Sequence, residues 1–242
     1  MSSPSPTEAP LDISVVIPVY NEETILRSAV LELCDRLAET GLRYEIVLAE
    51  NGSRDQTVSL AAELGREHAD VRYLSVPEPN YGKALRAGIL AARAPVVICD
   101  EIDLCYVDFY VRALELLRSG ADLVIGSKLI GGAEDRRPFV RHAASLAYTS
   151  LLRWLLGFQG TDTHGLKGFW RERLLPVVES CVIEHDVFAS ELVIRAYRAK
   201  LSVREVPIQV AEKRPPSINL LRRVPNVVKS LARLTWAVRV RG

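Results

Sequence analysis

Three acidic residues lie within four positions, at Asp100, Glu101 and Asp103, directly after the apolar run 96–99. Carboxylates this close repel one another, so a cation, basic side chains or solvent must compensate their charge. In an extended segment Glu101 and Asp103 point to the same side, because Ile102 between them points to the other. Such hard oxygen ligands suit Mg²⁺ or Mn²⁺, which completes its coordination shell with water and substrate phosphates. We therefore predict a divalent metal site here.

The alternative explanation for this cluster is a helix N-terminus, where the helix dipole favours acidic residues. That explanation accounts for Asp108 and for Asp103. It accounts poorly for Asp100, which directly follows an expected strand. The sequence leaves open which of Asp100 and Glu101 joins Asp103 as a metal ligand.

Apolar, β-branched segments alternate with helical patterns over the first half of the chain, which predicts an α/β fold. Near-continuous apolar strands indicate a mostly parallel sheet with helices on both faces. The expected strands are 13–20, 44–50, 71–76, 95–100 and 121–127, and the expected helices are 22–38, 55–68, 82–93 and 107–119. Asn21 is the expected N-cap of the first helix. Later we expect helices at 140–156 and 188–199 and a strand at 202–210.

Polar residues follow four of these strands, at 20–22, 50–53, 100–103 and 126–128. Ligands of open α/β sheets bind outside the carboxyl ends of the strands. We therefore expect one binding site at this edge. Glu50 is placed to accept hydrogen bonds from a base or ribose, and Lys83 either contacts a phosphate or is solvated.

The 242 residues fit one domain, with residues 1–10 expected as a flexible tail, 11–212 as the α/β domain and 213–242 as a basic amphipathic segment. The last segment has eight Lys or Arg and no Asp or Glu, which favours an anionic surface; a solvated helical face is the alternative. The net charge of +1 implies no particular partner. The four cysteines show no CxxC spacing and indicate free thiols in a reducing compartment.

Several motifs, in order, resemble the family-2 glycosyltransferases, whose catalytic domain has the GT-A fold. They are "VVIPVYNEE", "ENGSRDQT" for the usual DDGSxDxT, "NYGKALRAG", "ICDEIDL" for the DAD-L metal motif, and "VIGSKLIGG". The chain looks most like the dolichol- or polyprenyl-phosphate hexose synthases. Their later D-x-x-S-G-F-[RK] signature appears as 162–167, and their VPIxFxxR ending as "VPIQVAEKR". The resemblance covers about Ile13 to Arg214.

The resemblance implies an inverting transferase that moves a hexose from GDP- or UDP-hexose to a polyprenyl phosphate. The implied donor-binding residues are Pro18, Tyr20, Glu22, Glu50, Asn51 and Lys83, and the implied metal ligands are Asp103 with Glu101 or Asp100. The expected acceptor-phosphate residues are Arg137, Arg141, Lys167 and Arg214, of which Arg141 and Arg214 match arginines that hold the acceptor phosphate in the synthases that the chain resembles. The expected catalytic set is Asp103, Lys128, Arg141 and Arg214.

Two alternatives remain from the sequence. The same fold could use a hydroxyl acceptor, which would require a carboxylate base such as Glu191 or Asp162. The chain could also bind a nucleotide sugar without turnover. We expect an enzyme at the cytoplasmic membrane face with no membrane span and no nucleic-acid partner, and the sequence leaves a homo-oligomer open.

Overall fold

A computed structural model describes residues 10–132, 134–135, 139–185, 187–210 and 220–240, with side chains described except at 134–135, 139–141, 210, 220–228 and 240. The first elements are β1 (Ile13–Val19), α1 (Leu26–Thr40), β2 (Tyr44–Asn51), α2 (Thr57–Glu67), β3 (Val71–Val76), α3 (Tyr81–Ala91), β4 (Val96–Cys99), α4 (Val107–Arg118) and β5 (Leu123–Ser127). The later ones are β6 (Glu134–Asp135), α5 (Phe139–Leu156), β7 (Leu166–Trp170), α6 (Arg171–Ser180), α7 (Phe188–Arg198), β8 (Val203–Pro207), β9 (Gln209–Val210) and α8 (Leu220–Val240).

Seven strands form one sheet in the order β3-β2-β1-β4-β7-β5-β8. All neighbours are parallel except β7, which is antiparallel to both β4 and β5. The predicted mostly parallel α/β sheet is confirmed. Strand β7 was not predicted, because Lys167 and Gly168 interrupt its apolar pattern. Strands β6 and β9 form a separate two-stranded sheet.

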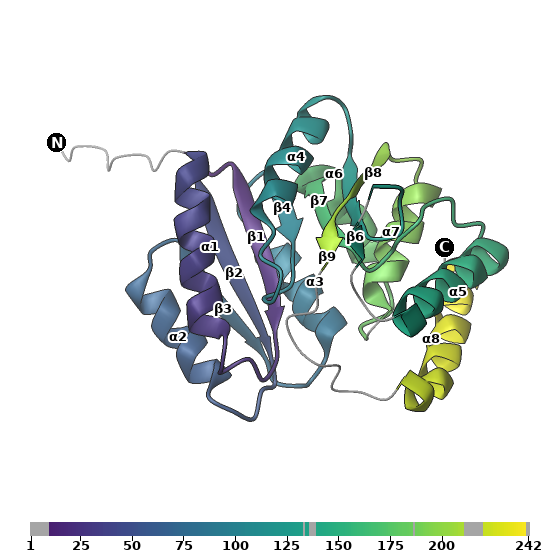
Figure 1. Cartoon of the computed structure of the whole chain (residues 1–242), viewed down its shortest axis with the longest axis horizontal. Coiled ribbons are helices and arrows are strands. Elements are labelled where there is room, and N and C mark those ends of the chain that lie inside the picture. Colours follow the sequence, from purple (N-terminus) through teal and green to yellow (C-terminus); the bar gives the residue numbers. More distant parts are fainter. Residues whose placement is uncertain (1–9, 133, 136–138, 186, 211–219, 241–242) are drawn as a thin grey trace.

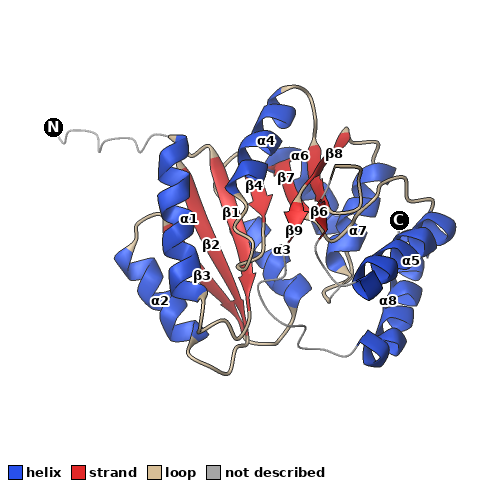
Figure 2. Cartoon of the chain, viewed as in Figure 1, coloured by secondary structure: helices blue, strands red, loops and turns tan. Residues whose placement is uncertain are grey.

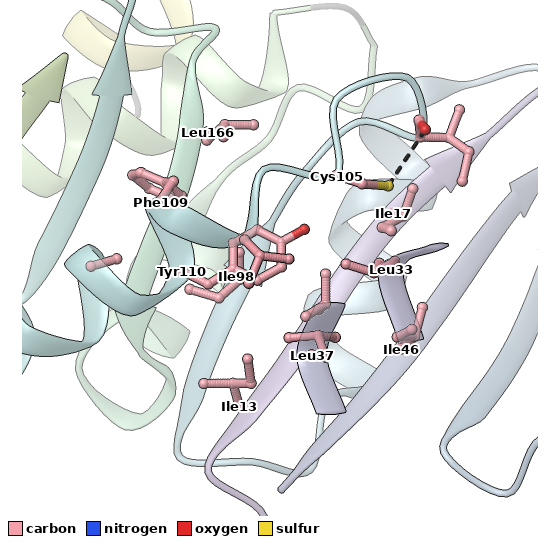
Figure 3. Close-up of a cluster of buried hydrophobic side chains, with 14 of the residues drawn as sticks. Ile13, Ile17, Leu33, Leu37, Ile46, Ile98, Cys105, Phe109, Tyr110 and Leu166 are labelled. Atoms are coloured by element: carbon pink, nitrogen blue, oxygen red, sulfur yellow. Dashed lines mark hydrogen bonds between the residues drawn. The ribbon is translucent and has the colours of Figure 1, made fainter. Parts of the chain in front are cut away.

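Helices cover both faces of the sheet (Figures 1 and 2). Helices α1, α2 and α4 lie on one face, and α3, α6 and α7 lie on the other. The first layer buries side chains such as Ile13, Leu33, Ile98 and Tyr110, which Figure 3 shows between the sheet and its helices. Burial of this apolar surface at roughly 25 cal/mol per Å² is the main force that holds the layers together.

The first helix differs from the prediction at its start. Helix α1 begins at Leu26, and Asn21 is not its N-cap. Asn21 instead has a positive φ of 53°, and its side chain accepts a hydrogen bond from Arg54 N at 2.9 Å. A short polar side chain tolerates this left-handed conformation. The residue therefore joins two loops at the sheet edge rather than starting a helix.

The C-terminal helix packs on the domain. Leu231 and Leu234 of this predicted amphipathic segment are buried in the cluster that includes α7 and the end of α5. Arg195 and Arg198 of α7 donate hydrogen bonds to Ala237 O at 3.1 Å and Val238 O at 2.5 Å. This end of α8 is thus part of the folded domain, and the boundary at 212/213 stays a prediction. Among the described residues, no helix is long and apolar enough to cross a membrane.

Candidate active site

The carboxyl ends of β1, β2, β4 and β5 meet at one edge of the sheet, because these strands run in the same direction. Strand β7 runs the other way, so its first residues lie at the same edge, between β4 and β5. Gly165, just before β7, passes so close to β5 that a Cβ there would lie 1.8 Å from Gly126 O. The predicted convergence is confirmed, and the segment 162–167 joins it.

Asp100 points inward at the end of β4. It is 3% exposed, and its carboxylate accepts hydrogen bonds from Tyr110 Oη at 2.5 Å, Tyr106 N at 2.9 Å and Glu101 N at 2.6 Å. Burial raises the pKa of Asp100 to about 6, against the effect of these hydrogen bonds. The carboxylate thus stabilises the turn that follows β4. We propose that Asp100 is not a metal ligand.

Glu101 and Asp103 are partly exposed, while Ile102 between them is buried in the core. Tyr81 at the start of α3 donates a hydrogen bond to Glu101 Oε1 at 2.6 Å, which fixes this side chain across the edge. Burial raises the pKa of Glu101 to about 7, and the charges of Asp103 and Asp100 add to the rise, against the Tyr81 hydrogen bond. Negative charge is therefore concentrated here, and the charge of Lys167 offsets only part of it.

The donor set fits a divalent ion that takes part of its shell from a substrate. Among the described residues, no group of three or more His, Cys, Asp and Glu side chains could hold a metal. Two carboxylates are sufficient for Mg²⁺ or Mn²⁺ in nucleotide sites, because phosphate oxygens and waters supply the remaining ligands. Glu101 and Asp103 are therefore the residues that would hold the ion.

The raised pKa of Glu101 gives a pH-dependent stability. A carboxyl group whose pKa is higher in the folded protein stabilises the fold fully below its unfolded pKa near 4.5, and this contribution is lost as the pH rises through about 7. Glu101→Gln stays neutral, so we expect its metal-free melting temperature at pH 8 to exceed that of the wild type by roughly 2–4 °C, with the difference vanishing near pH 4. Calorimetry in chelator measures this.

The matched control is Glu32→Gln, which neutralises an exposed carboxylate on α1. This variant should follow the wild type at every pH. Equal melting temperatures of Glu101→Gln and the wild type from pH 4 to pH 8 would contradict the account of charge at this edge.

Glu50 is fully buried at the end of β2. Its two oxygens accept hydrogen bonds from Ser53 N and Ser75 Oγ, each at 2.5 Å. The neighbouring Asn51 is also buried, and its Nδ2 donates to Val19 O at 3.0 Å. Glu50 thus shapes the loop after β2, and a contact with the base or ribose remains a prediction that would use its remaining lone pairs.

The loops after β1 and β2 are bonded together through side chains. Glu22 N donates to Thr57 Oγ1 at 2.7 Å, and Glu23 N donates to Asp55 Oδ2 at 3.3 Å. Pro18 lies within buried β1, and Tyr20 follows its end with 40% of its surface exposed. This bonding holds the loops that carry Tyr20 and Glu22 in place beside Pro18, and donor binding by the three residues stays a prediction.

Lys83 lies in the first turn of α3, which Asn80 caps by accepting from Lys83 N at 3.1 Å. Its ammonium pairs with Glu78 at 3.2 Å and Glu184 at 3.7 Å. The neighbouring Gly82 packs closely on protein, since a Cβ there would lie 2.5 Å from His185 O. The predicted phosphate contact of Lys83 would therefore require it to leave these acidic partners.

The opposite side of the edge is basic. Lys128, just after β5, lies 3.7 Å from Asp162 Oδ2, and both side chains are largely buried. Lys167 of β7 is 3% exposed and donates to Gly165 O at 2.8 Å; burial lowers its pKa. Although burial opposes the ionisation of Asp162, the charge of Lys128 and the His164 N–H lower its pKa. The structure thus brings two of the predicted cations, Lys128 and Lys167, together.

Residues near His164 form a network that the sequence did not indicate. Thr163 Oγ1 lies 2.8 Å from Ser190 Oγ of α7 and 3.2 Å from His164 Nδ1. Tyr148 of α5 bonds to the same Ser190 at 3.1 Å, and its ring packs edge-on against His164 at 5.3 Å. The surrounding protein, together with the charge of Lys128, lowers the pKa of His164 to about 4. This shift favours the neutral form of the ring, although His164 is exposed at the surface.

Three predicted acceptor residues cannot be placed. Arg137 and Arg214 lie outside the described residues. Arg141 lies in α5, but its side chain is outside the described part of the helix. Their roles therefore stay predictions from the sequence.

Neither candidate base for a hydroxyl acceptor is available. Glu191 is fully buried, accepts from Val182 N at 3.1 Å and Ile183 N at 2.8 Å, and pairs with Arg195 at 2.8 Å. Asp162 is 3% exposed and bonded to the His164 N–H at 2.8 Å. Both carboxylates hold local structure instead.

A mostly parallel sheet with paired carboxylates after its fourth strand is the arrangement expected of the GT-A fold. The chain is similar to glucosyl-3-phosphoglycerate synthase from Mycobacterium tuberculosis, solved in complex with Mn²⁺, UDP and glucosyl-3-phosphoglycerate. The TM-score is 0.66 at 22% identity, and the match covers 94% of this chain and 80% of that one. This similarity shows that the fold is GT-A.

The profile of glycosyl transferase family 2 matches residues 14–174, and the chain belongs to this family. It is 30% identical over 204 residues to a dolichyl-phosphate hexose transferase of Haloferax volcanii, covering 84% of each chain. It is 31% identical over 230 residues to a dolichyl-phosphate beta-glucosyltransferase of Drosophila melanogaster, covering 86% of this chain and 70% of that one. The protein is thus a glycosyltransferase related to dolichyl-phosphate sugar transferases.

Proposed function

We propose that this glycosyltransferase moves a hexose, with inversion, from GDP- or UDP-hexose to a polyprenyl phosphate. Glu101 and Asp103 hold Mg²⁺ or Mn²⁺ against the donor diphosphate. The donor-binding residues are Pro18, Tyr20, Glu22, Glu50, Asn51 and Lys83. The acceptor phosphate is held by Lys128, Arg137, Arg141, Lys167 and Arg214.

The observation that carries this proposal is that the site contains two cations, while neither of the two candidate bases is accessible. The second pKa of a phosphate monoester is near 6, so its oxygen is already ionised at neutral pH. It can attack the anomeric carbon directly while the bond from that carbon to the diphosphate breaks. Lys128 and Lys167 supply the positive charge that keeps two anions close, and the buried Glu191 could not accept a proton from a hydroxyl.

The divalent ion would neutralise the diphosphate that leaves. The chain's own residues do the positioning: Tyr81 orients Glu101, and the bonded loops after β1 and β2 hold the nucleoside side. The names of the curated relatives support a dolichyl-type acceptor, and the solved structures with UDP support a nucleotide-sugar donor.

Transfer of label from GDP- and UDP-hexoses tests the proposal, with and without Mn²⁺ and an added short-chain polyprenyl phosphate. We expect label in the lipid only when the cation is present. Transfer to water-soluble hydroxyl acceptors alone would overturn the lipid acceptor in favour of a soluble glycan or small molecule. Binding of donor without any turnover would contradict transfer itself.

Lys128→Met should separate acceptor from donor use. Loss of a charge-assisted hydrogen bond costs about 1.5–3 kcal/mol, which corresponds to a roughly 10- to 100-fold rise in the KM for polyprenyl phosphate. Donor affinity should change little. Steady-state kinetics and donor titration measure the two effects, with the melting temperature as a check on folding.

Lys83→Met is the matched control, because we expect it to weaken donor use instead. Equal losses for donor and acceptor in Lys128→Met would contradict its assignment.

A further inference from the structure

Helices α5 and α8 lie side by side at the end of the molecule opposite α1 and α2 (Figure 1). Their outer surface carries large exposed apolar side chains. Trp154 is 80% exposed, Trp236 is 51% exposed, and Leu146 and Leu151 are 46% and 41% exposed. We call these four residues the α5–α8 apolar face. Large apolar side chains exposed together on neighbouring helices are typical of an interaction site.

Among the described side chains, the outer side of α5 carries one charge, Arg153, which lies next to Leu146 at the border of this side. At the helical period of 100° per residue, Leu146, Leu151 and Trp154 fall within one broad face. The exposed residues Ala143, Ala147 and Ser150 lie on that same face. The large exposed apolar side chains of α5 therefore lie on one side of the helix, with Arg153 at its border.

The outer side of α8 is basic around its tryptophan. Lys229, Arg233 and Arg239 are exposed and fall on the same side of the helix as Trp236. Neither α5 nor α8 contains Asp or Glu. An aromatic ring among cations suits the boundary between lipid headgroups and acyl chains.

The inner side of α5 contacts the candidate active site. Tyr148 packs against His164, and Thr149 Oγ1 donates to Thr161 O at 3.2 Å. The same helix thus connects the α5–α8 apolar face to the segment beside Lys128 and Lys167. A lipid whose phosphate is held by these lysines would extend its chain toward this end of the molecule.

We propose that the α5–α8 apolar face docks on an anionic phospholipid surface, with Trp154 and Trp236 in the headgroup layer and Lys229 and Arg233 against lipid phosphates. This proposal rests on the lipid acceptor of the proposed function and names the surface that reaches it. Leu231 and Leu234 of α8 cannot contact the lipid, because they are buried in the domain. A second copy fits less well, since two-fold pairing would place the basic sides of α8 against each other.

The test is flotation of the full chain with vesicles of phosphatidylcholine alone or with about one-third phosphatidylglycerol. We expect binding to the anionic vesicles, weakened by salt. The double variant Trp154→Gln/Trp236→Gln should reduce the partition coefficient by roughly tenfold or more, because it removes two large apolar groups from the interface. Leu31→Gln, which replaces an exposed leucine on α1, is the matched control and should bind like the wild type.

Three outcomes would overturn docking: no binding to anionic vesicles, unchanged binding by the double variant, or a soluble dimer that the double variant dissociates in light scattering. The last outcome would assign the face to a second copy. Transfer to a short-chain acceptor in vesicle-free buffer keeps the two proposals apart. The double variant should retain that activity, whereas failure of the wild type to use the acceptor would count against the proposed function alone.

Discussion

Asp103→Ala is expected to reduce sugar transfer by about 10³-fold or more. Loss of this ligand would withdraw several kcal/mol of charge stabilisation from the departing diphosphate, and each 1.36 kcal/mol is a factor of ten in rate. Asp103 is partly exposed, and its charge raises the pKa values of Asp100 and Glu101. Its removal should therefore leave the melting temperature of the metal-free protein unchanged or slightly higher. Single-turnover transfer assays and calorimetry measure both effects.

Asp108→Ala is the control for this variant. Asp108 lies in the first turn of α4 with its side chain 77% exposed, and it pairs with Arg36 at 3.7 Å. The Asp108→Ala variant tests whether removal of any nearby acidic residue reduces activity, and we expect its sugar transfer to be near normal. Retained turnover in Asp103→Ala, or an equal loss in both variants, would argue against a metal held at this position.

Asp100→Ala is expected to affect stability far more than metal binding. The substitution leaves Tyr110 Oη and the amides of Glu101 and Tyr106 without their acceptor in a buried site. Buried donors left unpaired cost about 1–3 kcal/mol each, so we expect a total loss of about 3 kcal/mol, or roughly 6–12 °C in melting temperature. Titration of the folded variant with Mn²⁺ and nucleotide should give an affinity within about tenfold of the wild type.

Tyr110→Phe removes one of these three hydrogen bonds and should cost about 1 kcal/mol. A smaller loss of stability in Tyr110→Phe than in Asp100→Ala is expected if Asp100 has a structural role. If Asp100→Ala melted like the wild type and no longer bound Mn²⁺, Asp100 would be a ligand, and our choice of Glu101 would be wrong.

Local patterns predicted most of the sheet because its strands are continuous apolar runs. Strands β1, β2, β4 and β5 therefore appeared at the expected places, and so did the polar residues at their ends. Strand β7 was missed, because a buried lysine and two glycines occupy the segment 165–168. Its position between β4 and β5 comes from tertiary pairing and has no local signal.

The orientation of the site residues depended on partners distant in sequence. Asp100 turns inward toward Tyr110, ten residues away, and Asn21 bonds to Arg54 across two loops. Glu191 was a candidate base by residue type, yet it is buried beside Arg195. The predicted alternation is confirmed, because Glu101 and Asp103 are partly exposed and Ile102 between them is buried, while their role as metal ligands stays a prediction. Tyr81, which holds Glu101, lies in the motif 80–88 and has no local sequence signal for this contact.

A crystal structure of the protein grown with Mn²⁺ and a nucleoside diphosphate tests the central claim most directly. The account predicts an anomalous peak roughly 2.1–2.3 Å from carboxylate oxygens of Asp103 and Glu101 and from the diphosphate, with Asp100 still bonded to Tyr110. Manganese bound to Asp100, or diphosphate bound with both outward acids facing solvent and no ion between them, would contradict it.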